Sequence, residues 1–246
     1  MIPLRVPKTQ IVCVLSSGGP YDADDVLGLV HSIRRYDTFS QIICLTDRPG
    51  DVVQRVTFNG FSVRALEHNW PSWWAKLEAF SVPGPALYLD IDNRVVGDIR
   101  PILQRVEELK HEEYLMLDGF YRSPEVCSGV MGWNGDTSWL PNRFADHAAR
   151  ARWVDRGANL GVSARIDNLR YRGDQDWIAR QLALDLLTVR LAQSEFPGQI
   201  VSYKVHVQPT GIMPQDARIV CFHGRPRPRH IEPRPDWLTF PERSAA

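Results

Sequence analysis

The sequence predicts a single α/β domain in which helices cover a central, mostly parallel sheet. Short runs rich in β-branched residues alternate with segments of helical apolar spacing, which is the order typical of such a sheet. The 246 residues suffice for one domain of this kind, and no Gly/Ser-rich stretch or charge run indicates a boundary between two. We therefore expect one domain over residues 1–224, followed by a Pro- and Arg-rich strap or tail over 225–246.

The first half of the chain supplies four expected strands, at 10–17, 41–47, 61–66 and 86–92. Val26, Val30 and Ile33 form the apolar stripe of a helix after the first strand. A second helix is expected from Trp74 to Phe80. A Pro-Gly-Pro turn at 83–85 then leads into the fourth strand, whose polar end carries two carboxylates. A functional site is therefore expected at the C-terminal end of that strand.

The second half continues the alternation. A short helix is expected from Pro101 to Leu109, and a longer one from near Asp174. The expected strands are 113–119, 128–133 and 219–224, the stripe of the longer helix is Leu182, Leu186 and Val189, and the segment 143–172 is expected to be a solvated helix and loop that faces the acceptor.

Net charge does not indicate a polyanionic partner. Acidic and basic residues balance to a formal charge of zero, so attraction of the whole molecule to nucleic acid or an anionic membrane is not expected. The basic residues are 25 Arg and only four Lys. Arginine's planar fork suits phosphate, and a GC-rich genome would produce the same excess.

The apolar runs are the length of strands. IVCVL and ALYLDI fall far short of the ~20 residues that a membrane helix needs, and the N-terminus lacks a signal-peptide pattern. We therefore expect a cytoplasmic protein without a transmembrane segment. The cysteines show neither CxxC nor zinc-type spacing and are expected to be free thiols, mostly buried. They are Cys13, Cys44, Cys127 and Cys221.

Asp90 and Asp92 are the strongest candidates for chemistry. They lie two residues apart at the end of an apolar strand, so both side chains can reach one cation. Carboxylate oxygens suit Mg²⁺ or Mn²⁺, which complete their shells with substrate phosphates. Solvated aspartates in a strand-end turn are the alternative. The buried strand before them favours a site, because ligands of open α/β sheets bind at strand ends.

Two further segments carry candidate groups. His223 ends the last expected strand and is followed by Gly224 and Arg225, which offer an imidazole ligand, a position of close backbone approach and a guanidinium for phosphate. Asp174 and Gln175 begin a helix, where an Asp can cap free amide groups. A cap explains one acidic residue there but requires neither the Gln nor the second acid.

Five ordered motifs together resemble glycosyltransferase family 8, whose members have the GT-A fold. The resemblance extends from the first strand to Arg229. The motifs are WWAKLEAF (73–80), YLDID (88–92), CSGVM (127–131), GDQD (173–176) and FHGRPRP (222–228). Each is weak alone, and the resemblance depends on all five occurring in the family's order.

The resemblance implies a role for each matching residue. It implies a metal site of Asp90, Asp92 and His223, and donor contacts from Lys76. It places Asp174 and Gln175 at the donor sugar. Gly224 and Arg225 would approach the diphosphate; the family's lysine usually falls two places after Arg225, at Arg227, so both arginines are candidates.

The chain departs from the family at Cys127, where these enzymes commonly carry Asn near the donor sugar. A thiol cannot replace an amide as donor and acceptor, so Ser128 is a candidate for part of that role. Ser16 and Asp22 are expected to border the nucleotide, because the family's base-binding residues come from that region. Trp70, Trp73 and Trp74 are expected to anchor a helix in the core, with a stacking surface for a sugar or base as the alternative.

The implied activity is metal-dependent transfer of a hexose, from a UDP-sugar, to an acceptor hydroxyl with retention of configuration. The acceptor is left open among saccharide, protein, small molecule and hydroxymethylated DNA base. A sugar nucleotidyltransferase is an alternative, but SSGGPYD (16–22) lacks the glycines of its phosphate loop. A non-catalytic nucleotide-sugar-binding module is the other.

Overall fold

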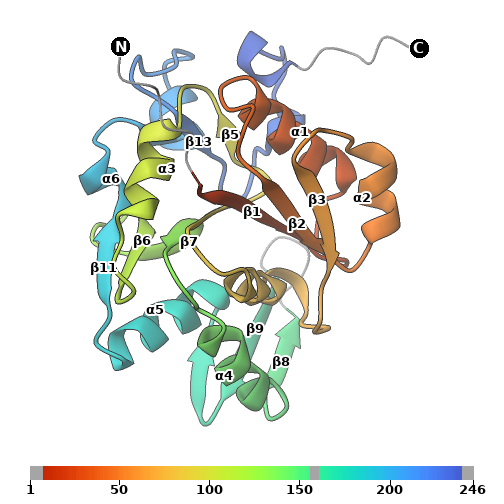
Figure 1. The fold of residues 1–246 in the computed structure, drawn as a ribbon, viewed down its shortest axis with the longest axis vertical. Helices are drawn as coiled ribbons and strands as arrows, with labels where there is room; N and C mark the ends of the chain where they lie inside the picture. Colours follow the sequence, from red (N-terminus) through yellow and green to blue (C-terminus); the bar gives the residue numbers. More distant parts are fainter. Residues whose placement is uncertain (1–7, 156–160, 240–246) are drawn as a thin grey trace.

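The computed structural model describes residues 8–155 and 161–239. Its central sheet has seven strands in the order β11-β6-β7-β4-β1-β2-β3 (Figure 1). The strands are β1 (Gln10–Leu15), β2 (Ile42–Thr46), β3 (Phe61–Ala65), β4 (Ala86–Leu89), β6 (Glu113–Asp118), β7 (Val126–Trp133) and β11 (Thr188–Leu191). Only β7 runs antiparallel to its neighbours in this sheet, so the predicted mostly parallel α/β architecture is confirmed.

Helices cover both faces of the sheet. On one face α1 and α3 pack against Ile11, Cys13 and Leu15 of β1, and on the other η1, α4 and α5 pack against Val12 and Val14. This strand is therefore buried on both sides, as parallel strands usually are. The helices are α1 (Ala23–Arg34), α2 (Pro49–Arg55), the 3₁₀ helix η1 (Ser72–Ser81), α3 (Arg100–Glu107), α4 (Trp139–Ala148), α5 (Asp174–Leu184) and α6 (Ala192–Glu195). None of the helices in the described ranges has the length and apolar character required to cross a membrane.

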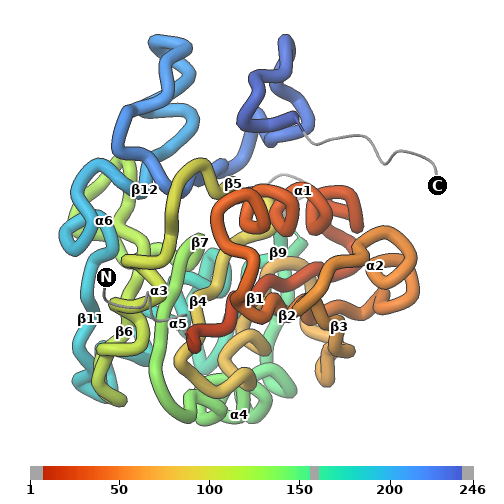
Figure 2. The backbone as a smooth tube through the Cα atoms, turned by 45° about the horizontal axis from the view of Figure 1, so that its top comes forward, coloured from red at the N-terminus to blue at the C-terminus, as the bar shows by residue number. Residues whose placement is uncertain are grey.

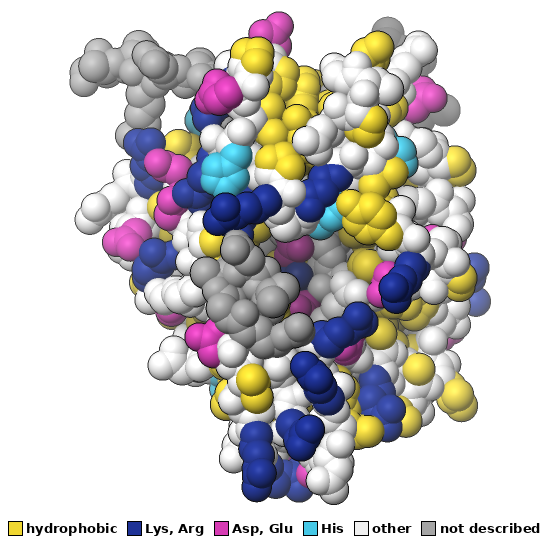
Figure 3. Space-filling view, turned by 180° about the vertical axis from the view of Figure 1, so that it is seen from behind, with side chains coloured by type: hydrophobic (Ala, Val, Ile, Leu, Met, Phe, Trp, Pro, Cys, Tyr) yellow, Lys and Arg dark blue, Asp and Glu magenta, His cyan; other side chains and the backbone are white. Residues whose placement is uncertain are grey.

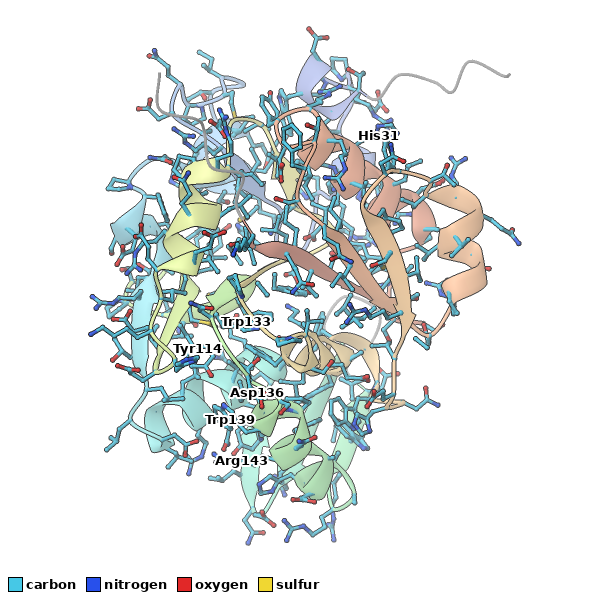
Figure 4. All side chains as sticks on the ribbon, viewed as in Figure 1. His31, Tyr114, Trp133, Asp136, Trp139 and Arg143 are labelled. Atoms are coloured by element: carbon cyan, nitrogen blue, oxygen red, sulfur yellow. The ribbon has the colours of Figure 1, made fainter. Side chains whose placement is uncertain are left out.

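Aromatic side chains pack between α4 and the sheet. The indole of Trp133 on β7 donates to the Val82 carbonyl oxygen at 2.9 Å. On α4 the Arg143 guanidinium lies 4.7 Å from the ring centre of Trp139. Figure 4 shows Tyr114 and Trp133 above these two residues. Phe144 of α4 stacks on Trp74 of η1 and meets Trp177 of α5 edge-on, so this layer supports the two helices that carry site residues.

Two smaller sheets complete the fold. One is antiparallel, in the order β10-β9-β8, and the other has the order β12-β13-β5. Their strands are β8 (Arg152–Asp155), β9 (Val162–Ile166), β10 (Leu169–Tyr171), β5 (Arg94–Val95), β12 (Ile200–Ser202) and β13 (Ile219–Cys221).

These sheets correct two expectations. The segment 143–172 was expected to be helix and loop, but only its start is helical and most of the rest forms the antiparallel sheet; residues 156–160 lie outside the described residues. The strand expected over 219–224 ends at Cys221 and belongs to the smaller β12-β13-β5 sheet.

The helix from Asp174 is shorter than its apolar pattern predicts. It ends at Leu184, and Leu186 has a φ of 53° and is 90% exposed. Val189 belongs to β11, where it packs beside the core from a strand. Leu186 therefore marks the turn between helix and strand, where a left-handed backbone breaks the helical repeat.

The C-terminal segment packs along α1. It contains two short 3₁₀ helices, η3 (Pro228–His230) and η4 (Asp236–Leu238), and Figure 2 shows it beside α1. Arg229 pairs with Asp22 at 2.9 Å and also with Asp25. Leu238 is buried, and Arg35 donates to the Asp236 carbonyl oxygen at 3.1 Å. Residues 225–239, which we call the strap, thus pack beside α1, and 240–246 lie outside the described residues.

Candidate functional site

Two adjoining cavities form a cleft at the C-terminal ends of β1 and β4. The larger has a volume of about 430 Å³ and the smaller about 250 Å³. Seen from behind, the molecule has a hollow whose floor carries both acidic and basic side chains (Figure 3). The residues lining both cavities are Trp73, Lys76, Asp90, Phe222 and His223.

The loop after β4 places the two expected carboxylates in the cleft. The Asn93 amide donates to the Asp90 carbonyl oxygen at 2.9 Å, which closes a tight turn. Two hydrogen bonds to the Gly129 carbonyl oxygen hold this turn against β7: the Asp90 amide donates at 3.0 Å and the Asn93 side chain at 2.7 Å. Asp90 and Asp92 both line the smaller cavity, at the strand end where the sequence predicts a site.

Lys76 links the acidic groups of the cleft. Its Nζ lies 2.9 Å from Oδ1 of Asp90 and 3.4 Å from Oδ2 of Asp174. It also donates to Ser128 Oγ at 3.1 Å, and that hydroxyl donates to Asp174 Oδ2 at 2.7 Å. These four candidates come from η1, the β4 loop, β7 and α5, and the fold brings them into one hydrogen-bonded network, the Lys76 network.

Burial and charge act against each other in this network. Burial lowers the pKa of Lys76, but the carboxylates of Asp174 and Asp90 raise it by more, so the ammonium stays charged. Burial raises the pKa of Asp174, against the opposing effect of Lys76 and the Ser128 hydroxyl. The Tyr88 hydroxyl donates to Asp90 Oδ1 at 2.8 Å. The charges are therefore held in fixed positions beside the cavity.

Asp174 does not cap its helix. The N-cap of α5 is Gly173, and no side-chain capping bond is formed there. The carboxylate points instead into the Lys76 network, while Gln175 lines the larger cavity. Helix capping, the structural alternative to a functional role for Asp174, is therefore wrong.

Asp92 is the more deeply buried of the two strand-end carboxylates, at 4% exposure. Burial and the charge of Asp90 raise the pKa of Asp92 to about 7, although the Tyr21 hydroxyl, which donates to its Oδ2 at 2.5 Å, lowers it. Among the described residues, Oδ1 of Asp92 and Oδ2 of Asp90 have no hydrogen-bond donor. Two repelling carboxylates with a spare oxygen each fit a cation that also draws ligands from phosphate and water.

His223 lines both cavities but is already hydrogen-bonded. Its Nε2 lies 2.7 Å from Ser202 Oγ, and its ring stacks on Phe120. Burial and the Lys204 ammonium lower the pKa of His223, which favours the neutral imidazole. Within residues 8–155 and 161–239, no three His, Cys, Asp or Glu side chains come together as a metal site.

Of the two arginine candidates, only Arg227 lines the smaller cavity. Arg227 is buried, lines this cavity and lies 4.9 Å from the ring centre of Tyr21. Arg225 is exposed and is not among the residues that line either cavity. Gly224 lines the smaller cavity with a φ of 73°, a conformation that glycine adopts without strain.

Of the two N-terminal candidates, Ser16 and Asp22, only Ser16 lines the cleft. Ser16 lines the smaller cavity. Asp22 does not line either cavity: it is the N-cap of α1, where its side chain accepts from the Asp24 and Asp25 amides, and it pairs with Arg229. Asp22 therefore holds the strap and the helix rather than facing the cleft.

Trp70 and Trp74 are buried in the core, as expected of two of the three tryptophans. The Trp74 ring stacks on Phe144 with centroids 5.0 Å apart, and its indole donates to the Val162 carbonyl oxygen at 2.6 Å. Trp73 lines both cavities instead. It is therefore the member of the cluster whose ring faces the cleft.

Several residues of the cleft region, among them Tyr88, Tyr21, Lys204 and Cys221, were not indicated as site residues by the sequence pattern. Tyr88 could have been found, since it lies two residues before Asp90 and so faces the same side of the strand. Tyr21 and Lys204 come from other loops and carry no local signal. The Cys221 thiol lines the larger cavity, and burial together with Asp92 and Asp90 raises its pKa. All four cysteines are free, as expected.

Neither a protein-family model nor a curated protein sequence matches this chain. Solved structures do. The glycosyltransferase GlyE of Streptococcus pneumoniae TIGR4 is 14% identical with a TM-score of 0.57, over 91% of this chain and 56% of GlyE. The galactosyltransferase LgtC, in complex with donor and acceptor sugar analogs, is 15% identical with a TM-score of 0.55, over 91% of this chain and 90% of LgtC.

Mouse xyloside xylosyltransferase 1 is 11% identical with a TM-score of 0.52, over 89% of this chain and 98% of that enzyme. The chain spans about half the length of GlyE and of the bifunctional glycosyltransferase WbbM, of which it covers 56% and 48%. The predicted GT-A fold is confirmed by these similarities.

Proposed function

We propose that the protein is a metal-dependent glycosyltransferase that transfers a hexose from a UDP-sugar to an acceptor hydroxyl. One observation carries the proposal: the Lys76 network lies on the wall shared by two cavities, beside a pair of strand-end carboxylates. One cavity suits the nucleotide and the other the sugar and acceptor. Their shared wall is where the bond between diphosphate and sugar would lie.

The nucleotide belongs in the smaller cavity. Ser16, Tyr21 and Trp73 give it polar and aromatic walls suited to a base and ribose. Arg227 and Gly224 lie at its diphosphate end, where a guanidinium can bind two phosphate oxygens and a glycine allows close backbone approach. Arg225 stands outside the lining and is the weaker candidate.

Asp90 and Asp92 are the proposed metal ligands, with His223 as the third. A bound Mg²⁺ or Mn²⁺ would supply Lewis-acid stabilisation of the charge on the departing diphosphate. Lys76 holds Asp90 in place and contributes a positive charge on the same wall. Arg227 adds a second charge from the strap.

The sugar is proposed to contact Asp174, Gln175 and Ser128. Asp174 is fixed by Lys76 and Ser128, so its carboxylate can steady positive charge on the sugar without reorganising. Ser128 follows Cys127, the position at which glycosyltransferases of family 8 commonly carry an Asn side chain. We favour retention by displacement on one face of the sugar, with the leaving diphosphate and the acceptor on the same side. GlyE, LgtC and xyloside xylosyltransferase 1 support transferase activity through their shared fold.

Hydrolysis of the donor by water tests this function without knowledge of the acceptor. A panel of UDP- and GDP-hexoses is incubated with the protein and Mn²⁺, and nucleoside diphosphate release is measured. We expect one UDP-hexose to be hydrolysed fastest, and Gln175→Ala to slow it while UDP affinity is kept. UDP binding without consumption of any donor would make the protein a binding module, and pyrophosphate release from a nucleoside triphosphate would make it a nucleotidyltransferase.

A further inference from the structure

Three arginines form a row across the β10-β9-β8 sheet. Arg152 on β8 and Arg170 on β10 both pair in register with Arg165 on the central strand β9. Residues paired directly across strands share a face, so the three side chains leave the sheet on one side. All three are exposed. Their in-register neighbours Trp153, Ala164 and Tyr171 pack on the other side, against the core. We call these residues the arginine row: Arg152, Arg165 and Arg170.

The arginine row has no carboxylate partner among the described residues. The neighbouring arginines differ, since Arg150 pairs with Asp167 and Arg172 pairs with Asp176. Like charges directly opposite one another destabilise a sheet, so the row carries an uncompensated repulsion. Charged side chains on edge strands protect against aggregation, which would explain Arg152 on β8 and Arg170 on β10. That explanation does not cover Arg165, because β9 is the central strand.

The arginine row leads into the larger cavity. β10 ends at Tyr171, and the next residues, Arg172 and Gly173, line that cavity. Figure 3 shows Lys and Arg side chains gathered on this face below the hollow. The same cavity is also lined by Phe120, which stacks on His223, and by Tyr121, which is 70% exposed and meets the same imidazole edge-on. The uncompensated charge of the arginine row thus ends two residues before the lining of a cavity that also contains aromatic rings.

We propose that the acceptor is a nucleic acid, whose phosphates bind the arginine row while one unstacked nucleotide enters the larger cavity. Adjacent strands are about 4.8 Å apart, so long arginine side chains on this spacing reach successive phosphates of an extended strand. Aromatic rings at the cavity offer stacking surfaces to any base. An anionic membrane fits less well, because the row lies on a rigid sheet and not on an amphipathic helix with a large apolar face.

This inference rests on the proposed function for its chemistry but is tested separately, by binding. Fluorescence anisotropy is measured with a labelled single-stranded oligonucleotide and with the duplex of the same sequence, over a salt series and without donor. We expect salt-dependent binding that is tighter for the single strand, because no base must leave a stack of pairs. Arg165→Gln should lower the slope of log affinity against log salt by about 0.7, and Arg165→Lys should retain most of it.

Arg64→Gln is the matched control, since Arg64 is an exposed arginine on β3, a strand of the central seven-stranded sheet. It should leave both affinity and slope unchanged. The melting temperature of Arg165→Gln should be no lower than that of the parent, because the change removes a like-charge contact.

Equal binding by Arg165→Gln and the parent would overturn the proposal, as would equal losses in Arg64→Gln. Binding to phosphatidylserine vesicles through Arg165, without oligonucleotide binding, would identify a membrane surface instead. Donor hydrolysis without nucleic acid is unaffected by any of these outcomes, so the two proposals fail separately.

Discussion

The ammonium of Lys76 lies 2.9 Å from Oδ1 of Asp90, and this pair joins the helix η1 to the loop that follows β4. The Lys76 side chain is 10% exposed, so its charge is largely removed from water. A buried cation of this kind is tolerated because two carboxylates compensate it. Loss of Lys76 therefore leaves the carboxylates of Asp90 and Asp174 without a compensating positive charge.

Lys76→Met tests the energetic role of this pair. The methionine keeps the chain length but removes the cation between Asp90 and Asp174. We expect the free energy of unfolding to fall by about 3–5 kcal/mol, because breaking a buried ion pair leaves uncompensated charge. Urea denaturation measures it. Lys110→Met, at an exposed lysine, should change stability little, and equal stability of Lys76→Met and the parent would show that the pair carries no net charge interaction.

Asp92→Asn tests the proposed metal site. The change keeps the size of the side chain but removes its charge, so Mn²⁺-dependent UDP binding should be lost while the fold is retained. Calorimetry with UDP, with and without Mn²⁺, measures binding. Asp51→Asn on α2 is the matched control, an exposed aspartate outside the cleft. Undiminished metal-dependent binding in Asp92→Asn would remove Asp92 from the site.

Asp174→Asn should separate catalysis from binding. Asp174 touches Lys76 and Ser128 on the wall of the larger cavity, so under the proposed function its charge is expected to act on the sugar in the transition state. Turnover in donor hydrolysis should drop by about 10²-fold, the scale of one electrostatic contact, while UDP affinity changes little. Asp185→Asn, at the C-cap of the same helix, should keep full turnover. A matching loss of UDP affinity would instead assign Asp174 to ground-state binding.

Glu78 should make stability depend on pH. Its carboxylate is buried and accepts from the amides of Glu67 at 2.6 Å and His68 at 3.1 Å. Burial raises the pKa of Glu78 although these amides lower it. A raised pKa in the folded state means that the contribution of Glu78 is present below its unfolded pKa and is lost as pH rises through the folded value.

Denaturation at several values between about pH 4 and about pH 7 measures this effect. The free energy of unfolding of the parent should decline more steeply with rising pH than that of Glu78→Gln, which cannot titrate. Parallel curves for the two proteins would mean that Glu78 keeps an ordinary pKa in the fold.

The local parts of the site were predictable, and its long-range contacts were not. Asp90 and Asp92 follow a run of apolar residues, so the neighbouring residues predict their place at a strand end. The contact of Lys76 with Ser128 spans 52 positions and that of Ser128 with Asp174 spans 46, and no spacing rule predicts them. Lys76 and Ser128 were indicated only through the resemblance to a family, whereas Asp174 was already a candidate from its place at the start of a helix.

The positions that the sequence left open or assigned to another role have physical causes of the same kind. Arg225 and Arg227 are two residues apart, and only the course of the strap decides which one enters the cleft. Asp22 matched a nucleotide-binding region but is used as a helix cap and an anchor for Arg229. The strands β8 to β10 are short and rich in arginine, so their hydrophobic alternation was too weak to indicate a sheet.

Trp73 and Trp74 give the last prediction, since adjacent residues of one helix have different surroundings. Trp74 is fully buried against Phe144, so Trp74→Ala should lower the free energy of unfolding by about 3–5 kcal/mol. Trp73 lines both cavities, so Trp73→Ala should cost less stability but weaken UDP binding, because a stacking surface is lost. Urea denaturation and UDP calorimetry on the two variants form a matched pair, and Trp73→Phe should recover part of the affinity. If Trp73→Ala binds UDP as tightly as the parent, the nucleotide does not stack on this ring, and the smaller cavity has to be reassigned.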